Sequence, residues 1–536
     1  MAASGGAARG RQVSLDGRSL TLDDVGGCAG AFPPSVGLEP GAEEAIRRSR
    51  KYVEDLLEGS EEIYGVTTGF GRLAEVVIPP SKRSDLQKNL IRSHCAGVGA
   101  PMEREEVRAI MILRANALAR GHSGCRLRVV KRLLDYLNRG IHPRVPNAGS
   151  VGASGDLAPL AHVALSLLGE GEVEYGGVVR PAAEVLAETG IEPLELKEKE
   201  GLALINGTQA TTALGILSLL RAEVAVETAE VAGAMTLEGL KGTPEAFRPE
   251  AHAVRPHPGQ STSAARLWAL LRDSEIRESH RYGDPRVQDA YSIRCMPQVH
   301  GASRDVLSYV RRVLETEANS TTDNPLVLPD AGAVISAGNF HAQVVAQALD
   351  FLAIALADLA AMSERRLERL LNPDLSGHPP FLTREPGLQS GFMIAQVTAV
   401  DLLAEMRVLA HPASVDSVPT SANQEDHVSM GLTAARKLRR SVECLEHVLA
   451  IELLCAAQAL EDLQPLRPGR GVEEAHDRLR EEIATLTRDR VLTGDIRRVT
   501  AMVREGTFSA IGLREGRGGE TRGKTEEENQ PGGESP

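Results

Sequence analysis

Long amphipathic segments constrain the fold of this chain more than any other feature of its sequence. Apolar residues recur at helical spacing in segments at residues 103–120, 202–240, 306–319, 339–371, 393–410 and 429–463. Several of these run well past about 25 residues, beyond the usual helix of a globular protein. Helices of that length with few strands between them favour a large helical bundle over alternating β-α units. We therefore expect a mainly α fold with a long central helical bundle.

Short strands are expected only in a smaller N-terminal part of mixed structure. Alternating segments at residues 13–15 and 19–22 surround Asp16-Gly17, and segments at 172–175 and 178–179 surround Gly176-Gly177. Both patterns predict short β-hairpins. We expect this part to span residues 11–200 and the long-helix bundle to span residues 201–513.

The two ends of the chain have a different composition. Residues 1–10 are mostly Ala, Gly and Ser, and residues 514–536 are rich in Gly, Glu and Arg. Both are predicted to be disordered, because they cannot bury enough apolar surface to offset the entropy of ordering.

The charge balance and the cysteine pattern limit the functional class. The chain has 60 Lys and Arg against 73 Asp and Glu, a net charge of −13, which argues against general nucleic-acid binding. Its 6 cysteines include no CxxC pair and its 14 histidines no HExxH motif. We therefore expect reduced thiols, a cytoplasmic location and no bound metal. No apolar run follows Met1, so no secretory signal is expected.

The most apolar stretch, residues 344–362, is interrupted by Gln347, Asp350 and Asp358. These polar side chains favour a buried helix over a membrane span, so we expect no membrane association.

The most unusual local sequence is GSVGASGDLAPL at residues 149–160. Its first half is nearly all small residues, and its second half is typical of a helix start, with Asp156 as N-cap and Pro159 in the first turn. This places Ser154 just before a helix N-terminus, where backbone N–H groups and the helix dipole are positive.

Three interpretations of this string compete. In the first, it is simply a Gly-rich turn before a helix. In the second, it carries a serine nucleophile, although Gly-Ala-Ser-Gly-Asp misses the Gly-x-Ser-x-Gly frame by one position. In the third, the nitrogen of Gly155 attacks the carbonyl of Ala153. Loss of water then closes a five-membered ring, and loss of the Ser154 hydroxyl leaves an electrophilic methylidene.

Ala153-Ser154-Gly155 within GSVGASGDLAPLAH strongly resembles the histidine and phenylalanine ammonia-lyase family. The resemblance extends from about residue 13 to about residue 510. It implies a 4-methylideneimidazol-5-one (MIO) group built from these three residues, with no external cofactor. It also implies a homotetramer in which several chains assemble each active site.

The resemblance assigns roles to further residues in matching blocks. Tyr64, in YGVTTGFG, is the implied base, with Tyr291 as an alternative proton acceptor; Arg294 is implied to hold the substrate carboxylate. Asn206, Gln288 and Tyr291 are implied to support the MIO oxygen and the amino end of the substrate. Asn324 and Phe340 complete the implied binding set. Each also has a structural alternative: a core tyrosine, an ion-paired arginine, or an amide that caps the backbone.

Two blocks indicate histidine as the substrate. His94 lies in IRSH, where phenylalanine-specific relatives look apolar, and Glu425 lies in NQEDHVSM. A buried imidazole needs hydrogen-bond partners, which these side chains provide and a phenyl ring does not use. Tyrosine-specific relatives also carry a histidine at the position of His94, so that residue alone does not decide.

The implied reaction is elimination of ammonia from L-histidine to give trans-urocanate, the first step of histidine degradation. The alternatives are a tyrosine or phenylalanine ammonia-lyase or an aminomutase of the same family, a non-catalytic scaffold of the same fold and, more distantly, a serine hydrolase.

Overall fold

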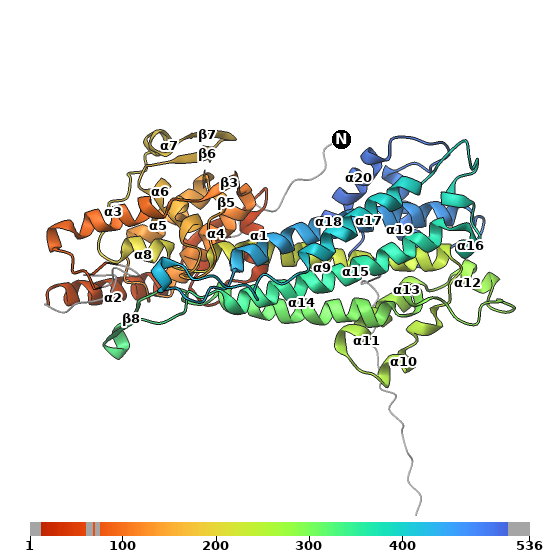
Figure 1. Cartoon of the computed structure of the whole chain (residues 1–536), viewed down its shortest axis with the longest axis horizontal. Helices are drawn as coiled ribbons and strands as arrows, with labels where there is room; N and C mark the ends of the chain where they lie inside the picture. The colour runs from red at the N-terminus through yellow and green to blue at the C-terminus, as the bar shows by residue number, and fades with distance from the viewer. Residues whose placement is uncertain (1–11, 60–67, 70–74, 513–536) are drawn as a thin grey trace, which may run out of the picture.

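The bundle predicted from the long amphipathic segments forms the body of the molecule. The computed structural model describes residues 12–59, 68–69 and 75–512, so the predicted disorder of residues 1–10 and 514–536 lies outside the described residues. Long helices run side by side along the long axis of the molecule (Figure 1). They are α9 (Gln209–Gly239), α14 (Met296–Ala318), α15 (Gln343–Leu371), α17 (Met393–Leu409) and α18 (Gly431–Glu461).

The bundle core is aliphatic, as the composition requires. α18 packs against both α9 and α15, and its buried residues between Leu432 and Leu460 are mostly Leu, Val, Ile and Ala. α15 is the one helix of the described ranges that is long and apolar enough to cross a membrane. Of its apolar 18-residue stretch, 61% is buried inside the protein. Its Asp350 accepts hydrogen bonds from Lys437 Nζ (2.9 Å) and from the Ser414 amide (2.8 Å). α15 therefore packs here as a core helix.

One predicted helix is interrupted. The segment at residues 202–240 forms α8 (Glu200–Ile205) and α9, separated by residues 206–208. The apolar spacing continues across this break, so periodicity alone does not reveal it. The segment at 306–319 also starts earlier than predicted, at Met296, where α14 begins.

Several helices and most of the strands form the N-terminal end of the molecule (Figure 1). The helices are α1 (Leu22–Ala29), α2 (Pro40–Leu57), α3 (Arg83–His94), α4 (Arg104–Ala119), α5 (Leu127–Arg139), α6 (Leu157–Leu167) and α7 (Ala182–Thr189). The strands are β1 (Gln12–Leu15), β2 (Ser35–Leu38), β3 (Val98–Pro101), β4 (Ile141–Pro143), β5 (Pro146–Ala148), β6 (Glu172–Tyr175) and β7 (Val178–Pro181).

One predicted hairpin is confirmed and the other is wrong. β6 and β7 pair in antiparallel fashion through Gly176 and Gly177, both at positive φ. In contrast, β1 pairs in parallel with β2, and the expected return strand at residues 19–22 leads into α1. Thr21 caps that helix in a capping box with Asp24, so a helix-start signal overrides the short alternation.

The opposite end of the bundle carries several further helices (Figure 1). They are α10 (Pro249–Ala253), α11 (Pro258–Leu270), α12 (Glu275–Ser279), α13 (Tyr291–Arg294), α16 (Pro373–Ser376), α19 (Arg470–Glu482) and α20 (Leu492–Arg504). A small antiparallel pair, β8 (Leu326–Leu328) with β9 (Ala333–Ile335), lies near the N-terminal end.

Candidate active site

The Gly-rich string forms a tight loop between β5 and α6. Gly155 has a φ of +76°, and a Cβ built there would lie 2.4 Å from the carbonyl oxygen of Gly207. The Asp156 amide donates to that same oxygen at 2.7 Å. Only glycine fits at position 155, because any side chain would collide with the backbone of the α8–α9 break.

Asp156 occupies the N-cap position of α6, as predicted, but its side chain makes no capping bond to that helix. Its carboxylate instead accepts hydrogen bonds from the amide and hydroxyl of Thr211, at 2.7 and 2.9 Å, and from Ser150 Oγ at 2.7 Å. Burial raises the pKa of the Asp156 carboxyl. Because Thr211 lies in the first turn of α9, this carboxylate ties the loop to the bundle.

Ser154 is held from two sides by residues that the sequence predicts for the site. Its hydroxyl donates to Glu425 Oε1 at 2.5 Å, and its carbonyl oxygen accepts from Asn206 Nδ2 at 3.0 Å. The other carboxylate oxygen of Glu425 accepts from Thr420 Oγ1 at 2.7 Å. These hydrogen bonds hold the loop between the α8–α9 break and the segment before α18.

A cavity of about 500 Å³ opens over Ser154. Asn324 is fixed at its wall, since its Oδ1 accepts from the Ala337 amide at 2.7 Å. The cavity brings together five of the predicted site residues. Its lining consists of Ala153, Ser154, Asn324, Ser336, Ala337, Gly338, Phe340, His341, Gln424, Glu425, Asp426 and His427.

Two histidines of the cavity wall were given no role from the sequence. The rings of His341 and His427 stack with centroids 5.7 Å apart and planes 1° from parallel. His341 Nε2 lies 3.2 Å from the carbonyl oxygen of His427. Both follow closely on predicted residues, Phe340 and Glu425, and that adjacency is the signal that could have pointed to them.

The contacts of Ser154 do not fit the serine hydrolase alternative. A serine nucleophile of that type needs a base, usually histidine, to accept its proton. The Ser154 hydroxyl donates to a carboxylate instead, while the histidines of the cavity stack on each other.

Three predicted residues lie far from this cavity within the chain. Gln288, Tyr291 and Arg294 belong to the segment around α13, at the opposite end of the bundle from α6 and α8 (Figure 1). Tyr291 is 69% exposed, and the Arg294 guanidinium lies over its ring, 4.4 Å from the centroid. A single chain therefore does not bring these residues to Ser154.

Among the described residues, His94 also does not line this cavity. It is the last residue of α3, with Nδ1 2.8 Å from the carbonyl oxygen of Leu90. Tyr64 lies outside the described residues.

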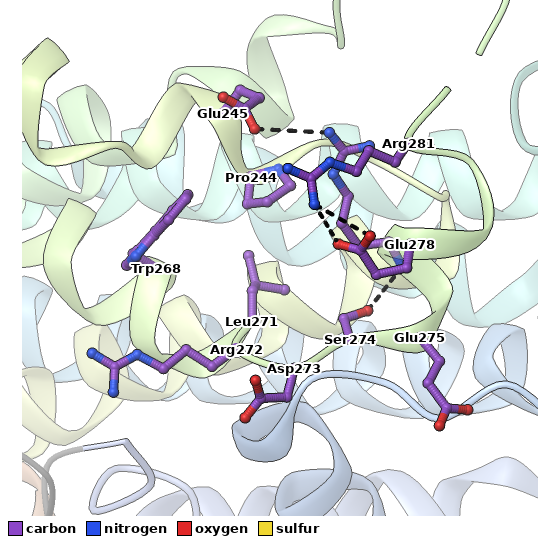
Figure 2. A pocket seen from close by; sticks show the side chains of 11 residues that line it. Pro244, Glu245, Trp268, Leu271, Arg272, Asp273, Ser274, Glu275, Glu278 and Arg281 are labelled. Carbon is purple, nitrogen blue, oxygen red and sulfur yellow. Dashed lines mark hydrogen bonds and ion pairs between the residues drawn. The ribbon is translucent and has the colours of Figure 1, made fainter. Parts of the chain in front are cut away.

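A second cavity, of about 640 Å³, lies at the far end of the bundle between Trp268, Ser274 and Arg281 (Figure 2). Most of its charged side chains are engaged in ion pairs. Arg281 pairs with Glu278 at 3.2 Å, and Arg277 pairs with Glu245 at 3.8 Å. We therefore place the candidate active site at the Ser154 cavity. Within the described ranges, no group of three or more His, Cys, Asp or Glu residues is arranged to hold a metal ion.

Comparison with known proteins identifies the family of this chain. The family model described as aromatic amino acid lyase matches residues 20–481. The chain belongs to this family. It is similar to the histidine ammonia-lyase of Anaeromyxobacter sp. (strain K), with 56% identity over 500 residues that cover 92% of this chain and 98% of the relative. It is also similar to the histidine ammonia-lyase of Gloeobacter violaceus, with 55% identity over 92% of this chain and 96% of the relative.

Solved structures in this aromatic amino acid lyase family share the fold. Histidine ammonia-lyase from Trypanosoma cruzi superposes with a TM-score of 0.87 at 44% identity, covering 94% of this chain and 95% of that chain. Tyrosine aminomutase from Streptomyces globisporus superposes with a TM-score of 0.89 at 41% identity, covering 94% and 99%. Because a lyase and an aminomutase fit about equally well, the fold does not select the reaction.

Proposed function

We propose that this protein is an ammonia-lyase that converts L-histidine to trans-urocanate and ammonia, with an MIO group formed from Ala153, Ser154 and Gly155. One observation carries the proposal. Ala153 and Ser154 line a cavity, with an amide donor on the Ser154 carbonyl and a carboxylate on the Ser154 hydroxyl.

The residues of the loop fit the formation of this group. Ring closure joins the Gly155 nitrogen to the Ala153 carbonyl carbon. The carbonyl oxygen leaves as water with the amide hydrogens of Ser154 and Gly155. A second water takes the Ser154 hydroxyl and its α-hydrogen. Gly155 suits this closure because it has no side chain and is held at positive φ against Gly207.

Asn206 supports the same group. The Ser154 carbonyl is retained in the ring, so a donor to its oxygen withdraws electron density from the adjoining carbon atoms. Asn206 Nδ2 already donates to that oxygen at 3.0 Å. When formed, the group supplies an electrophilic carbon that makes the substrate nitrogen a better leaving group.

Glu425 supports histidine as the substrate. Its carboxylate lies 2.5 Å from the hydroxyl of Ser154, so it faces the space that a substrate ring enters. An imidazole N–H pairs with a carboxylate, whereas a phenyl ring would leave the carboxylate desolvated and unpaired. The named histidine ammonia-lyases at 55–56% identity favour the same substrate. We assign His94 as a further imidazole partner.

The remaining roles are part of the proposal. Tyr64 removes the β-proton, with Tyr291 as the alternative acceptor. Arg294 holds the substrate carboxylate through a two-pronged pair, and Gln288 supports the amino end. Asn324 and Phe340 shape the cavity that both line.

A homotetramer would bring the α13 residues to the cavity of another chain. The exposed faces of α15 and α17 support this part of the proposal, because several large apolar side chains are exposed there and an exposed apolar face can form a contact between chains. These side chains are Val344, Phe351, Ile354, Ile394, Val397, Val400 and Val408. The free cysteines suit a reducing cytoplasm.

Near-ultraviolet absorbance tests the function. Purified protein is mixed separately with L-histidine, L-tyrosine and L-phenylalanine, and ammonia release is followed in parallel. We expect a urocanate band with L-histidine only. A coumarate or cinnamate band instead would overturn the substrate assignment. No product from any of the three would overturn the proposed function.

A further inference from the structure

The α8–α9 break sets the geometry of Ser154. Two of its residues touch the loop directly: Asn206 through its side-chain donor to the Ser154 carbonyl (3.0 Å) and Gly207 through its carbonyl oxygen to the Asp156 amide (2.7 Å). A side chain that holds residues 206–208 in place therefore also holds Asn206 Nδ2 on the Ser154 carbonyl oxygen.

Arg114 lies directly beneath this break. It comes from α4, is 1% exposed, and donates from Nη1 to the carbonyl oxygen of Asn206 (3.0 Å) and to Gln209 Oε1 (2.9 Å). Its Nη2 donates to the carbonyl oxygen of Ala203. One guanidinium thus spans the end of α8, the first residue of the break and the start of α9.

The charge of Arg114 is directed at carbonyl groups. The carboxylate that acts on it from nearby, Asp323, is itself ion-paired with Lys199 Nζ at 2.8 Å. The partners of Arg114 include two carbonyl oxygens at the C-terminal end of α8, where backbone acceptors are left without intrahelical donors. A planar fork with several fixed donors satisfies such separated acceptors at once, which a single ammonium cannot do.

The partner of Arg114 on α9 is held in turn. Gln209 Nε2 donates to Thr322 Oγ1 at 2.7 Å, and the neighbouring Thr208 hydroxyl donates to Glu317 at 2.5 Å. The break is therefore clamped from α4, α14 and the segment before Asn324. Arg114 is the member of this clamp that reaches both sides of the break.

We propose that Arg114 is a positioning residue for the reaction. By holding Ala203, Asn206 and Gln209 together, it keeps the Asn206 amide on the Ser154 carbonyl, and both ring formation and turnover depend on that contact. This inference rests on the proposed function. Displacing a catalytic contact by about 1 Å typically costs about a hundredfold in rate.

Arg108 offers a matched control on the same helix. It is 3% exposed and donates to the carbonyl oxygens of Cys28 (2.6 Å) and Leu137 (3.0 Å), with His142 Nε2 at 3.3 Å. Arg108→Lys and Arg114→Lys each replace a buried fork by an ammonium among backbone carbonyls. Only Arg114 touches the α8–α9 break.

The experiment compares full-length wild type, Arg114→Lys and Arg108→Lys. Intact mass gives the fraction of chains that have lost two water molecules, and melting curves give the change in Tm. Kinetics with L-histidine give kcat per matured chain and KM. For Arg114→Lys we expect the matured fraction to fall several-fold and kcat per matured chain to fall at least about tenfold, with KM within about twofold. Arg108→Lys is expected to keep both the matured fraction and kcat within about twofold at a similar loss of Tm.

Equal matured fractions and equal kcat in the two variants would overturn the role of Arg114. If Arg114→Lys does not fold, Gln209→Leu is measured instead, because it removes one of the three acceptors of Arg114 and leaves the guanidinium in place. A loss in the same direction supports the proposal, and wild-type values overturn it. A wild-type chain that retains both water molecules overturns the proposed function itself, and the role of Arg114 with it.

Discussion

The hydroxyl of Ser154 and the carboxylate of Glu425 meet at 2.5 Å, although the two residues are 271 positions apart in the sequence. The contact joins the loop before α6 to the segment before α18, and both residues line one cavity. It places an acceptor for the substrate ring beside the residue proposed to form the electrophile. Substitutions around this pair therefore test substrate choice separately from ring formation.

Glu425→Gln is expected to lower kcat/KM for L-histidine by about a hundredfold or more, because the charged acceptor for the imidazole is lost. Thr420→Val removes only the donor to the second carboxylate oxygen, so a smaller loss of about threefold to tenfold is expected. Thr420→Ser keeps the hydroxyl and serves as the control. Steady-state kinetics that show equal losses for Thr420→Val and Thr420→Ser would remove Thr420 from this role.

Gly155→Ala is expected to prevent ring formation, because the added methyl group would lie 2.4 Å from the Gly207 carbonyl oxygen. Gly176→Ala is the control, since Gly176 also has positive φ but open space around its Cβ position. Both variants carry the conformational cost of about 1–2 kcal/mol for a left-handed residue. Intact mass reports ring formation, and Tm reports the conformational cost that both variants share. A Gly155→Ala protein that still loses two water molecules would contradict the close fit at Gly207.

Activity is expected to return when two inactive variants assemble together. Ser154→Ala lacks the electrophile, and Arg294→Ala lacks the proposed carboxylate partner, which lies at the other end of the bundle. Co-expression of the two chains is expected to restore about a quarter of wild-type activity by random mixing, because intact sites combine one residue from each chain. Assays of the co-purified protein check this. Activity no higher than that of the separate variants would place each site within one chain.

The buried Glu238 carboxyl on α9 predicts a pH-dependent stability. Burial raises its pKa from 4.5 to about 7. Between these values the folded protein keeps a proton that the unfolded chain releases, so the free energy of unfolding falls as pH rises. The loss is complete above about pH 7 and amounts to about 3 kcal/mol.

Glu238→Gln removes this titration and isolates it. Denaturant titration from pH 4.5 to pH 8 gives the unfolding free energy of wild type and of Glu238→Gln. As pH rises, we expect the unfolding free energy of the wild type to fall relative to that of Glu238→Gln. A difference that stays constant with pH would contradict the raised pKa.

The long helices could be predicted because their apolar spacing persists for many turns, as in α15 and α18. The break at residues 206–208 could not, because it is held by distant side chains, Arg114 and Glu317, which no local pattern around Asn206 reveals. The first predicted hairpin failed for a local reason. Thr21 and Asp24 start a helix where the alternation suggested a strand.

The candidate site could be proposed from the sequence where its residues sit in short, unusual strings, and its roles remain predictions. Ala153, Ser154 and Glu425 lie at one cavity as expected. His341 and His427 were missed because a histidine beside a motif has many ordinary roles. The roles of Tyr291 and Arg294 at the site remain predictions for the assembled protein, since one chain holds them at the opposite end of the bundle from Ser154.

Intact mass of the purified full-length protein shows whether Ala153, Ser154 and Gly155 have formed the MIO group. We expect the wild-type chain to be lighter than its encoded sequence by two water molecules. We also expect Ser154→Ala to retain the water that would leave with the Ser154 hydroxyl. A wild-type mass equal to that of the encoded sequence would contradict formation of the MIO group, because Ala153, Ser154 and Gly155 would then remain an ordinary loop.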